Sequence, residues 1–161
     1  KFLAMEKKGE LNITDKRMTR FNITLEKAIN FVGNSLRIMW GGEIFVPKIP
    51  SYRIMDLAKA INGNCTYKFI GRRPGEKLHE EMITKSDSIN TIEFDSFYVI
   101  CPPLPNWKIS DYTQRYNGQY IGRIKDGFEY NSKKNQFFLS IEELKELIHQ
   151  NQKINLDNHA N

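Results

Sequence analysis

Residues 71–83 read GRRPGEKLHEEMI, a Pro-Gly turn with two arginines before it and a glutamate directly after it. The run that precedes the turn, residues 66–70, is rich in β-prone side chains and predicts a strand. Pro74 suits the entry to a helix because its missing N–H would have no partner there, so a short helix is predicted over residues 77–83. A strand, a turn and a helix in this order indicate an α/β fold, in which ligands often bind at such strand ends.

The residue types of this turn suit a phosphorylated, hydroxylated ligand. Arginine offers a rigid fork that matches phosphate oxygens, and the carboxylate of Glu76 can accept hydrogen bonds from a diol such as ribose. The turn alone is better explained as a solvated surface on which Arg72 and Arg73 pair with Glu80 and Glu81.

The chain before the turn alternates between helix and strand. Thr24 can cap an amphipathic helix that ends at Gly41 and Gly42. Residues 43–46 are short and apolar, as in a buried strand of a parallel sheet, although a buried helical turn has the same pattern. A second helix is predicted from residues 54 to 61. The apolar positions that predict the first helix follow steps of three and four: Leu25, Ala28, Ile29, Val32, Leu36 and Met39.

The chain after the turn is more irregular. Residues 91–100 are predicted to be extended and residues 106–135 to be rich in loops. Ser140 and Glu143 form a capping-box pattern that opens a last helix through about residue 149. The tail over residues 151–161 is polar and is expected to be disordered.

The beginning of the chain suggests a larger protein. Residues 1–8 read as the tail of a helix without a capping residue before it. One or two predicted strands do not make a doubly wound sheet, so the missing strands are expected upstream.

Composition excludes several classes of function. The 161 residues suit one domain, and 40% hydrophobic with 27% charged residues is ordinary for a soluble protein. The net charge of +5 suits an anionic ligand, but the basic residues are spread along the chain, so no nucleic-acid partner is expected. No stretch approaches the roughly 18 apolar residues of a membrane span, so we expect a cytoplasmic location and no membrane partner.

Metal and disulfide chemistry are not predicted either. Cys65 and Cys101 lack close pairing and are expected to be reduced and structural. Glu80 and Glu81 have no histidine or aspartate at metal-ligand spacing, so no metal site is expected.

Three segments together carry a family resemblance. The stretch 71–83, read with MTRF at 18–21 and GGEIFVPKIP at 41–50, resembles the C-terminal part of the inverting UDP-N-acetylglucosamine 4,6-dehydratases. These enzymes are extended short-chain dehydrogenases/reductases that act on sugar nucleotides. The resemblance covers residues 1–148 in the same order, and Pro74 favours the inverting branch over the dehydratase/5-epimerases, which carry histidine there.

The resemblance implies a fold and a division of the chain. Residues 1–150 would form the C-terminal substrate-binding portion of the dehydratase, with the end of the Rossmann-type sheet and the small substrate-binding domain. The N-terminal region that binds NADP would be absent.

The resemblance also implies roles for three residues. Arg20 and Arg73 match the pair that holds the UDP pyrophosphate, and Glu76 matches the acid that binds the ribose. Without the resemblance, Arg20 would be expected to pair with Asp15 or Glu26.

Three further positions lie in or next to the motif segments, and each has its own expected role. Arg72 is less expected to touch ligand, because adjacent residues of an extended segment point to opposite sides. His79 is expected to be a packing or surface residue. Asn22 stands where the family usually has an aromatic residue, so the apolar contact of that residue is not expected in the pocket wall.

No catalytic residue is predicted within this chain. It has no Gly-x-x-Gly-x-x-Gly after a strand, and we expect no Tyr-x-x-x-Lys acid/base pair in it. The chain alone is therefore expected to be inactive.

The implied reaction belongs to the longer protein. Tightly bound NADP oxidises C4 of UDP-N-acetylglucosamine, water is eliminated across C5 and C6, and the hydride returns to C6 with inversion at C5. The product would feed bacterial surface glycans or flagellin glycosylation through pseudaminic acid, and the full protein is expected to be a homo-oligomer. The alternatives are a sugar-nucleotide epimerase or reductase of the same superfamily, or a stand-alone UDP-sugar-binding module.

The first helix and the strand after it raise a question of stability. Apolar faces on residues 25–39 and 43–46 would normally be covered by the absent sheet, so the chain alone is expected to aggregate or to be partly disordered.

Overall fold

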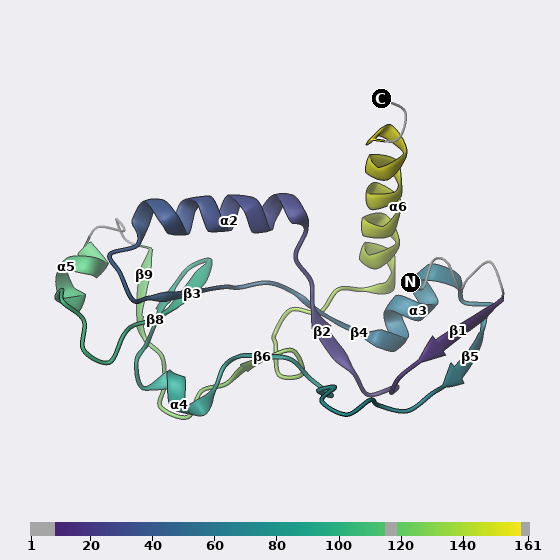
Figure 1. Cartoon of the computed structure of the whole chain (residues 1–161), viewed down its shortest axis with the longest axis horizontal. Helices are drawn as coiled ribbons and strands as arrows, with labels where there is room; N and C mark the ends of the chain where they lie inside the picture. Colours follow the sequence, from purple (N-terminus) through teal and green to yellow (C-terminus); the bar gives the residue numbers. More distant parts are fainter. Residues whose placement is uncertain (1–8, 115–118, 159–161) are drawn as a thin grey trace. The chain divides into compact units, whose positions relative to one another are not determined.

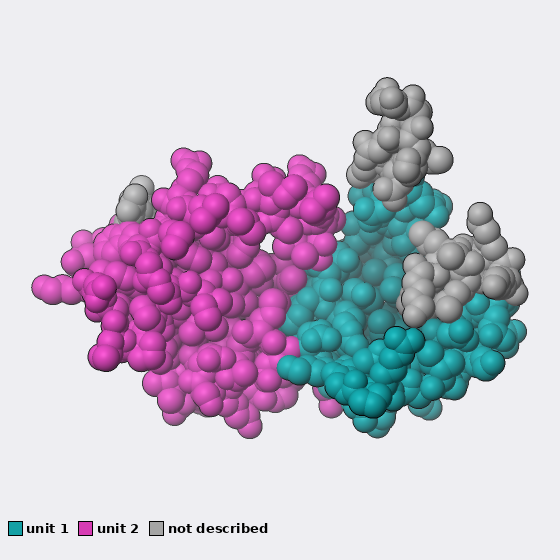
Figure 2. All heavy atoms as spheres, viewed as in Figure 1, with its two compact units in different colours: residues 1–22, 50–80, 135–161 teal, residues 23–49, 81–134 magenta. Residues whose placement is uncertain are grey.

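The computed structural model describes residues 9–114 and 119–158, and it divides into two compact units (Figure 2). Neither unit is a continuous stretch of chain. The helical tail predicted over residues 1–8 lies outside the described residues. Unit 1 contains Lys1–Asn22, Pro50–Glu80 and Asn135–Asn161, and unit 2 contains Ile23–Ile49 and Glu81–Lys134.

Unit 1 contains two strand pairs (Figure 1). Strand β1 (Glu10–Ile13) runs parallel to β5 (Thr66–Phe69), which confirms the strand predicted before the Pro-Gly turn. Strand β2 (Thr19–Phe21) runs antiparallel to β4 (Ser51–Arg53). The buried core of this unit consists of Leu11, Ile13, Ala58 and Cys65.

Two helices complete unit 1. Helix α3 (Ile54–Asn62) confirms the second predicted helix. Helix α6 (Ile141–Asn158) begins with the predicted capping box: the Ser140 N–H donates to Glu143 Oε2 over 2.8 Å, and the Glu143 N–H donates to Ser140 Oγ over 3.1 Å. The helix continues past the end predicted near residue 149, so the polar tail is helical as far as Asn158.

The segment before α6 is attached to β4. The Ser51 N–H donates to the Phe137 carbonyl and the Leu139 N–H donates to the Ser51 carbonyl, both over 2.8 Å. Asn135 Nδ2 also donates to Ser51 Oγ, and Ser51 is fully buried. The C-terminal part of the chain is therefore part of the support of the β2–β4 pair.

Unit 2 is built on a four-stranded antiparallel sheet in the order β3-β8-β7-β9 (Figure 1). The prediction of a parallel strand at 43–46 is wrong, because β3 (Ile44–Pro47) pairs antiparallel with β8 (Phe97–Ile100). The apolar run could not decide this, since buried strands of either kind have the same composition. The hairpin of β7 (Thr91–Phe94) and β8 accounts for the extended segment predicted at 91–100, and β9 (Tyr120–Arg123) pairs with β7.

Shorter elements fill the rest of unit 2. Strand β6 (Glu81–Ile83) pairs antiparallel with β10 (Tyr130–Asn131). Helix α4 (Lys85–Ser88) has a capping box made by Thr84 and Asp87. Helix α5 (Ile109–Gln114) lies in the region predicted to be loop-rich, and its Tyr112 joins a buried cluster with Ile92, Phe94, Phe97, Val99 and Cys101.

The helix predicted over residues 77–83 is wrong. Leu78 and His79 form a bend without helical structure, and residues 81–83 are strand β6. The tertiary pairing with β10 overrides the local pattern there, because it buries the side chain of Ile83 completely.

Helix α2 (Leu25–Ile38) confirms the first predicted helix and its cap, since Thr24 Oγ1 accepts from the Lys27 N–H over 3.3 Å. Phe31 and Ile38 pack against the core of unit 2. A second apolar face of the helix is exposed, as expected from the sequence. We call this face the α2 seam, and its residues are Leu25, Ile29, Val32, Leu36 and Met39, which are between 46% and 77% exposed.

Candidate functional site

The Pro-Gly turn and strand β2, which the sequence analysis singled out separately, are joined in unit 1. The Arg20 side chain reaches from β2 to the end of the turn, where its Nε lies 3.3 Å from Glu80 Oε1. The pairing predicted from the residues alone, with Asp15 or Glu26, is therefore wrong. The guanidinium also donates to the carbonyls of Thr19 (2.7 Å), Leu78 (3.2 Å) and Lys77 (3.0 Å) and to Met18 Sδ (3.5 Å).

A second set of contacts fixes the same end of the turn. His79 Nδ1 lies 2.8 Å from Thr19 Oγ1, and the Thr19 N–H donates to the Leu78 carbonyl over 3.2 Å. The structure thus places His79 in a partly buried packing position, as expected. Residues 77–80 are held against β2 by side-chain and main-chain contacts together.

The other end of the turn is attached to the loop after β1. The Ile70 N–H donates to the Ile13 carbonyl over 2.9 Å. Arg72 Nε lies 3.9 Å from Asp15 Oδ2, so Arg72 pairs with Asp15 rather than with Glu80 or Glu81. The solvated Arg–Glu surface predicted for the isolated motif does not form.

Asp15 is the centre of this attachment. Its carboxylate accepts three hydrogen bonds from Arg17: from Nη2 over 2.7 Å, from the main-chain N–H over 2.9 Å and from Nε over 3.0 Å. These bonds, with smaller contributions from the charges of Arg17 and Arg72, hold the pKa of the Asp15 carboxyl far below its ordinary value. Asp15 is therefore charged at neutral pH.

The tip of the turn is exposed and held by its own residues. Gly71 and Gly75 have φ values of +79° and +83°, which favour glycine. Glu76 Oε2 accepts from the Arg73 N–H over 2.9 Å, and the Glu76 N–H donates to the Arg73 carbonyl over 3.1 Å. Within residues 9–114 and 119–158, no side chain pairs with the exposed Arg73 guanidinium.

The three predicted site residues therefore lie around one turn, but their side chains make different contacts. Arg73 presents its donors to solvent, Glu76 braces the turn with one carboxylate oxygen, and Arg20 binds main-chain carbonyls. Sequence reasoning did not identify the attachment through Asp15 or the partner role of Glu80, because both depend on contacts between segments more than 50 residues apart.

The sequence does contain one Tyr-x-x-x-Lys spacing, Tyr130 to Lys134, which our motif analysis wrongly excluded. It does not form an acid/base pair. The Tyr130 hydroxyl donates to the Ile49 carbonyl over 3.0 Å and accepts from the Ile49 N–H over 2.9 Å, and burial raises its pKa. Lys134 pairs with Glu129 instead. The tyrosine and the lysine of this spacing thus bind different partners in the structure.

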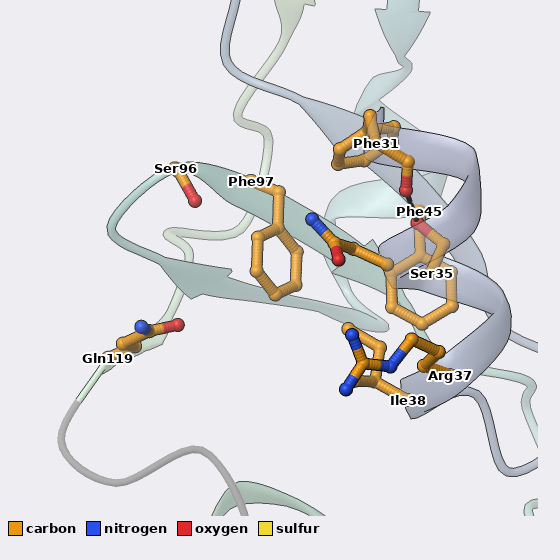
Figure 3. A pocket seen from close by; sticks show the side chains of 9 residues that line it. Phe31, Ser35, Arg37, Ile38, Phe45, Ser96, Phe97 and Gln119 are labelled. Atoms are coloured by element: carbon orange, nitrogen blue, oxygen red, sulfur yellow. Dashed lines mark hydrogen bonds between the residues drawn. The ribbon is translucent and has the colours of Figure 1, made fainter. Parts of the chain in front are cut away.

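Unit 2 contains a separate open cavity of about 510 Å³, shown in Figure 3. Its walls include the rings of Phe31, Phe45 and Phe97, and polar groups of Arg37 and Gln119 lie at its border. The Ser35 hydroxyl, also in the lining, donates to the Phe31 carbonyl of the same helix over 2.8 Å. Nothing in the sequence pattern predicted this cavity, because the lining residues come from four distant segments.

The described part of the chain shows neither a metal-binding cluster nor a membrane-spanning helix. Residues 9–114 and 119–158 contain no group of three histidine, cysteine or acidic side chains placed to hold a metal ion. No helix in these ranges combines the length and the apolar content that crossing a membrane requires.

Comparison with known proteins supports the resemblance read from the motifs. Residues 2–102 match a family model described as polysaccharide biosynthesis protein. The chain belongs to this family. The match covers β1 to β8, and so includes Arg20, the whole Pro-Gly turn and most of the sheet of unit 2.

Curated relatives of the polysaccharide biosynthesis family agree with the motif analysis. The inverting UDP-N-acetylglucosamine 4,6-dehydratase of Campylobacter jejuni subsp. jejuni serotype O:2 is 47% identical over 149 residues, which are 92% of this chain and 45% of the relative. The UDP-glucose 4-epimerase of Rickettsia bellii is 31% identical over 153 residues, 92% of this chain and 42% of the relative. The chain thus spans a little under half the length of these relatives.

A solved structure gives the same result for the fold. The X-ray structure of Pen from Bacillus thuringiensis has 29% sequence identity and a TM-score of 0.76, and the match covers 94% of this chain and 44% of that chain. The α/β class predicted from the sequence is confirmed, with both parallel and antiparallel strand pairs.

Proposed function

We propose that this chain is the UDP-sugar-binding, C-terminal part of an inverting UDP-N-acetylglucosamine 4,6-dehydratase. The observation that carries the proposal is the turn itself: it presents an exposed Arg73 guanidinium beside Glu76, and the motif lies in a chain 47% identical to such an enzyme. In this proposal Arg20 and Arg73 bind the pyrophosphate, and Glu76 binds the ribose hydroxyls.

Arg20 can take this role only by exchanging partners. All five of its N–H donors have an acceptor in the structure. The two longest contacts are those with the Met18 thioether sulfur, at 3.5 Å, and with the carboxylate of Glu80, which is 44% exposed, at 3.3 Å. Phosphate oxygens would replace these two while the carbonyl contacts to the turn remain.

The cofactor would be bound elsewhere in the longer protein. NADP would take up the hydride from C4 and return it to C6 in the proposed reaction, and this chain has no Gly-x-x-Gly-x-x-Gly loop that would fit its phosphates. The role of this chain is then to hold the UDP group so that the sugar is presented to the other part. A product used for bacterial surface glycans or flagellin glycosylation through pseudaminic acid, a cytoplasmic location and a homo-oligomer complete the proposal.

A titration with UDP tests the binding site. Arg73→Ala and Arg20→Ala should each weaken UDP binding by about 1.5–3 kcal/mol, because each removes a charged hydrogen bond to phosphate. This corresponds to roughly 10- to 150-fold in Kd. Arg37→Ala, an exposed arginine of unit 2, is the matched control and should leave the affinity unchanged. Unchanged affinity in both site variants would contradict the assignment of Arg20 and Arg73 to the pyrophosphate.

Product analysis of the full-length protein tests the reaction. A dehydratase converts UDP-N-acetylglucosamine into a 4-keto-6-deoxy sugar nucleotide, whereas an epimerase only inverts a hydroxyl-bearing carbon. The 31% identity to a UDP-glucose 4-epimerase makes epimerisation the second candidate. A 4-epimer without loss of water would favour it over the dehydratase. UDP binding by a protein without either product would favour a stand-alone binding module.

A further inference from the structure

One carboxylate lies at the base of the turn that carries Arg73. The turn is attached at its far end to β2 through residues 77–80 and at its near end to the loop after β1. At the near end, the side-chain attachment is the pair of Asp15 with Arg72, the residue next to Arg73 in the chain. The Asp15 side chain is only 14% exposed, whereas that of Arg72 is 46% exposed.

The sign of this charge is unexpected beside an anion site. A negative group near a pyrophosphate opposes binding by simple Coulomb repulsion. Asp15 is nevertheless held in place by three hydrogen bonds from Arg17, which fix the carboxylate where Arg72 can reach it.

We propose that Asp15 is a positioning residue of the UDP site, acting through Arg72 on the turn that presents Arg73. The inference rests on the proposed function. Asp15 binds Arg72 and keeps that arginine from the ligand, so the direction of the turn is fixed and Arg73 alone faces the anion from the tip. The attachment also limits the movement of the turn before ligand binds, which reduces the entropy lost on binding.

Asp15→Asn separates position from charge. An asparagine side chain can still accept the Arg17 main-chain hydrogen bond, so the local turn is retained, but it no longer carries the charge that holds Arg72. We expect UDP affinity, measured by calorimetry at low ionic strength, to fall roughly three- to tenfold. Electrostatics alone predicts the opposite, because the variant removes a negative charge near an anion, and unchanged or tighter binding would overturn the proposal.

Two matched variants complete this experiment. Asp15→Glu keeps the charge, so its UDP affinity should be close to that of the wild type. If the loss in Asp15→Asn came only from local packing, Asp15→Glu would lose affinity as well. Asp126→Asn removes the same charge from an exposed position of unit 2 and should leave UDP affinity unchanged.

A second cycle tests the proposal without Asp15→Asn, should that variant fail to fold. Arg72→Gln is expected to weaken UDP binding in the wild-type background and to have no further effect in an Arg73→Ala background, because Arg72 acts through Arg73. An equal loss in both backgrounds would mean that Arg72 contacts the anion itself, and the proposal would be wrong. If the wild-type protein does not bind UDP, the proposed function fails; if it binds and only the Asp15 and Arg72 results disagree, this inference fails alone.

Discussion

Arg20 and Arg73 show how differently two arginines of one motif set can be used. The Arg20 guanidinium binds three main-chain carbonyls, and the Arg73 guanidinium is exposed with no side-chain partner in the described ranges. Both were predicted as ligand contacts from the sequence. The sequence could supply the residue type and the turn, but it could not show that residues 77 and 78 come within hydrogen-bond distance of Arg20.

The carbonyl contacts of Arg20 predict a loss of stability that does not involve ligand. Arg20→Lys should lower the free energy of unfolding by about 1–2 kcal/mol, because a lysine ammonium cannot reach the same set of carbonyls in the geometry of a guanidinium. Urea unfolding followed by circular dichroism measures it. Arg37→Lys on the exposed side of α2 is the control, and equal midpoints for the two variants would show that the carbonyl contacts give no net stabilisation.

At the scale of the element, capping and tertiary pairing decided what the sequence could predict. The helices α2, α3 and α6 were predicted because each has a strong apolar period or a capping residue. The helix predicted over residues 77–83 failed because strand pairing with β10, far along the chain, determines the structure there. The prediction of parallel pairing for β3 is wrong for the same reason, because the direction of pairing depends on where the β7–β8 hairpin lies.

The capping box of α6 predicts a pH dependence. Hydrogen bonds from the Ser140 main chain and hydroxyl lower the pKa of Glu143 in the folded state. A lowered folded-state pKa contributes stability above the unfolded-state value, and this contribution is lost as pH falls through the folded-state value. The melting temperature of wild type should therefore exceed that of Glu143→Gln at pH 7, and the difference should shrink below about pH 4.5. A difference in melting temperature that stays constant down to pH 3 would contradict a lowered folded-state pKa of Glu143.

Helix α2 predicts a stabilising substitution. Gly33 is exposed in the middle of the helix, and a Cβ added there would meet no atom within 4 Å. Gly33→Ala should therefore raise the free energy of unfolding by about 0.5–1 kcal/mol. Gly42→Ala is the contrast, because Gly42 has a φ of +86° and its Cβ would lie 3.3 Å from Pro102. Thermal melts of both variants measure these changes in stability. A higher melting temperature for Gly42→Ala than for the wild type would contradict the positive φ of Gly42.

At the scale of the whole molecule, the α2 seam is the feature with the clearest consequence for the isolated chain. Its five residues follow steps of four and three, which is the spacing that helices use to pack against other helices. Replacing Ile29 and Leu36 with Glu and Lys should reduce self-association, measured by light scattering as a function of concentration. The exposed polar residues Lys27 and Asn34 of the opposite face provide a control pair, and equal scattering for both pairs would show that the seam does not drive association.

The division into two units could not be predicted from the sequence. The pattern of strands and helices gives the class, and the resemblance to the dehydratases gives the family, but each unit is assembled from segments separated by the other. Only long-range contacts, such as those of Ser51 with Phe137 and Leu139, define which segments belong together. Local patterns carry no information on such contacts.

The attachment of Phe137 and Leu139 to Ser51 has a consequence for synthesis on the ribosome. Translation delivers the chain from its N-terminus, and the last residue of unit 2, Lys134, precedes both of these residues. Unit 2 is therefore complete in sequence while unit 1 still lacks the segment that binds Ser51 of β4. Strand β2, with Arg20, is made before the segment that completes the support of its partner β4, so a nascent chain that stalls before Leu139 holds Arg20 without its finished framework.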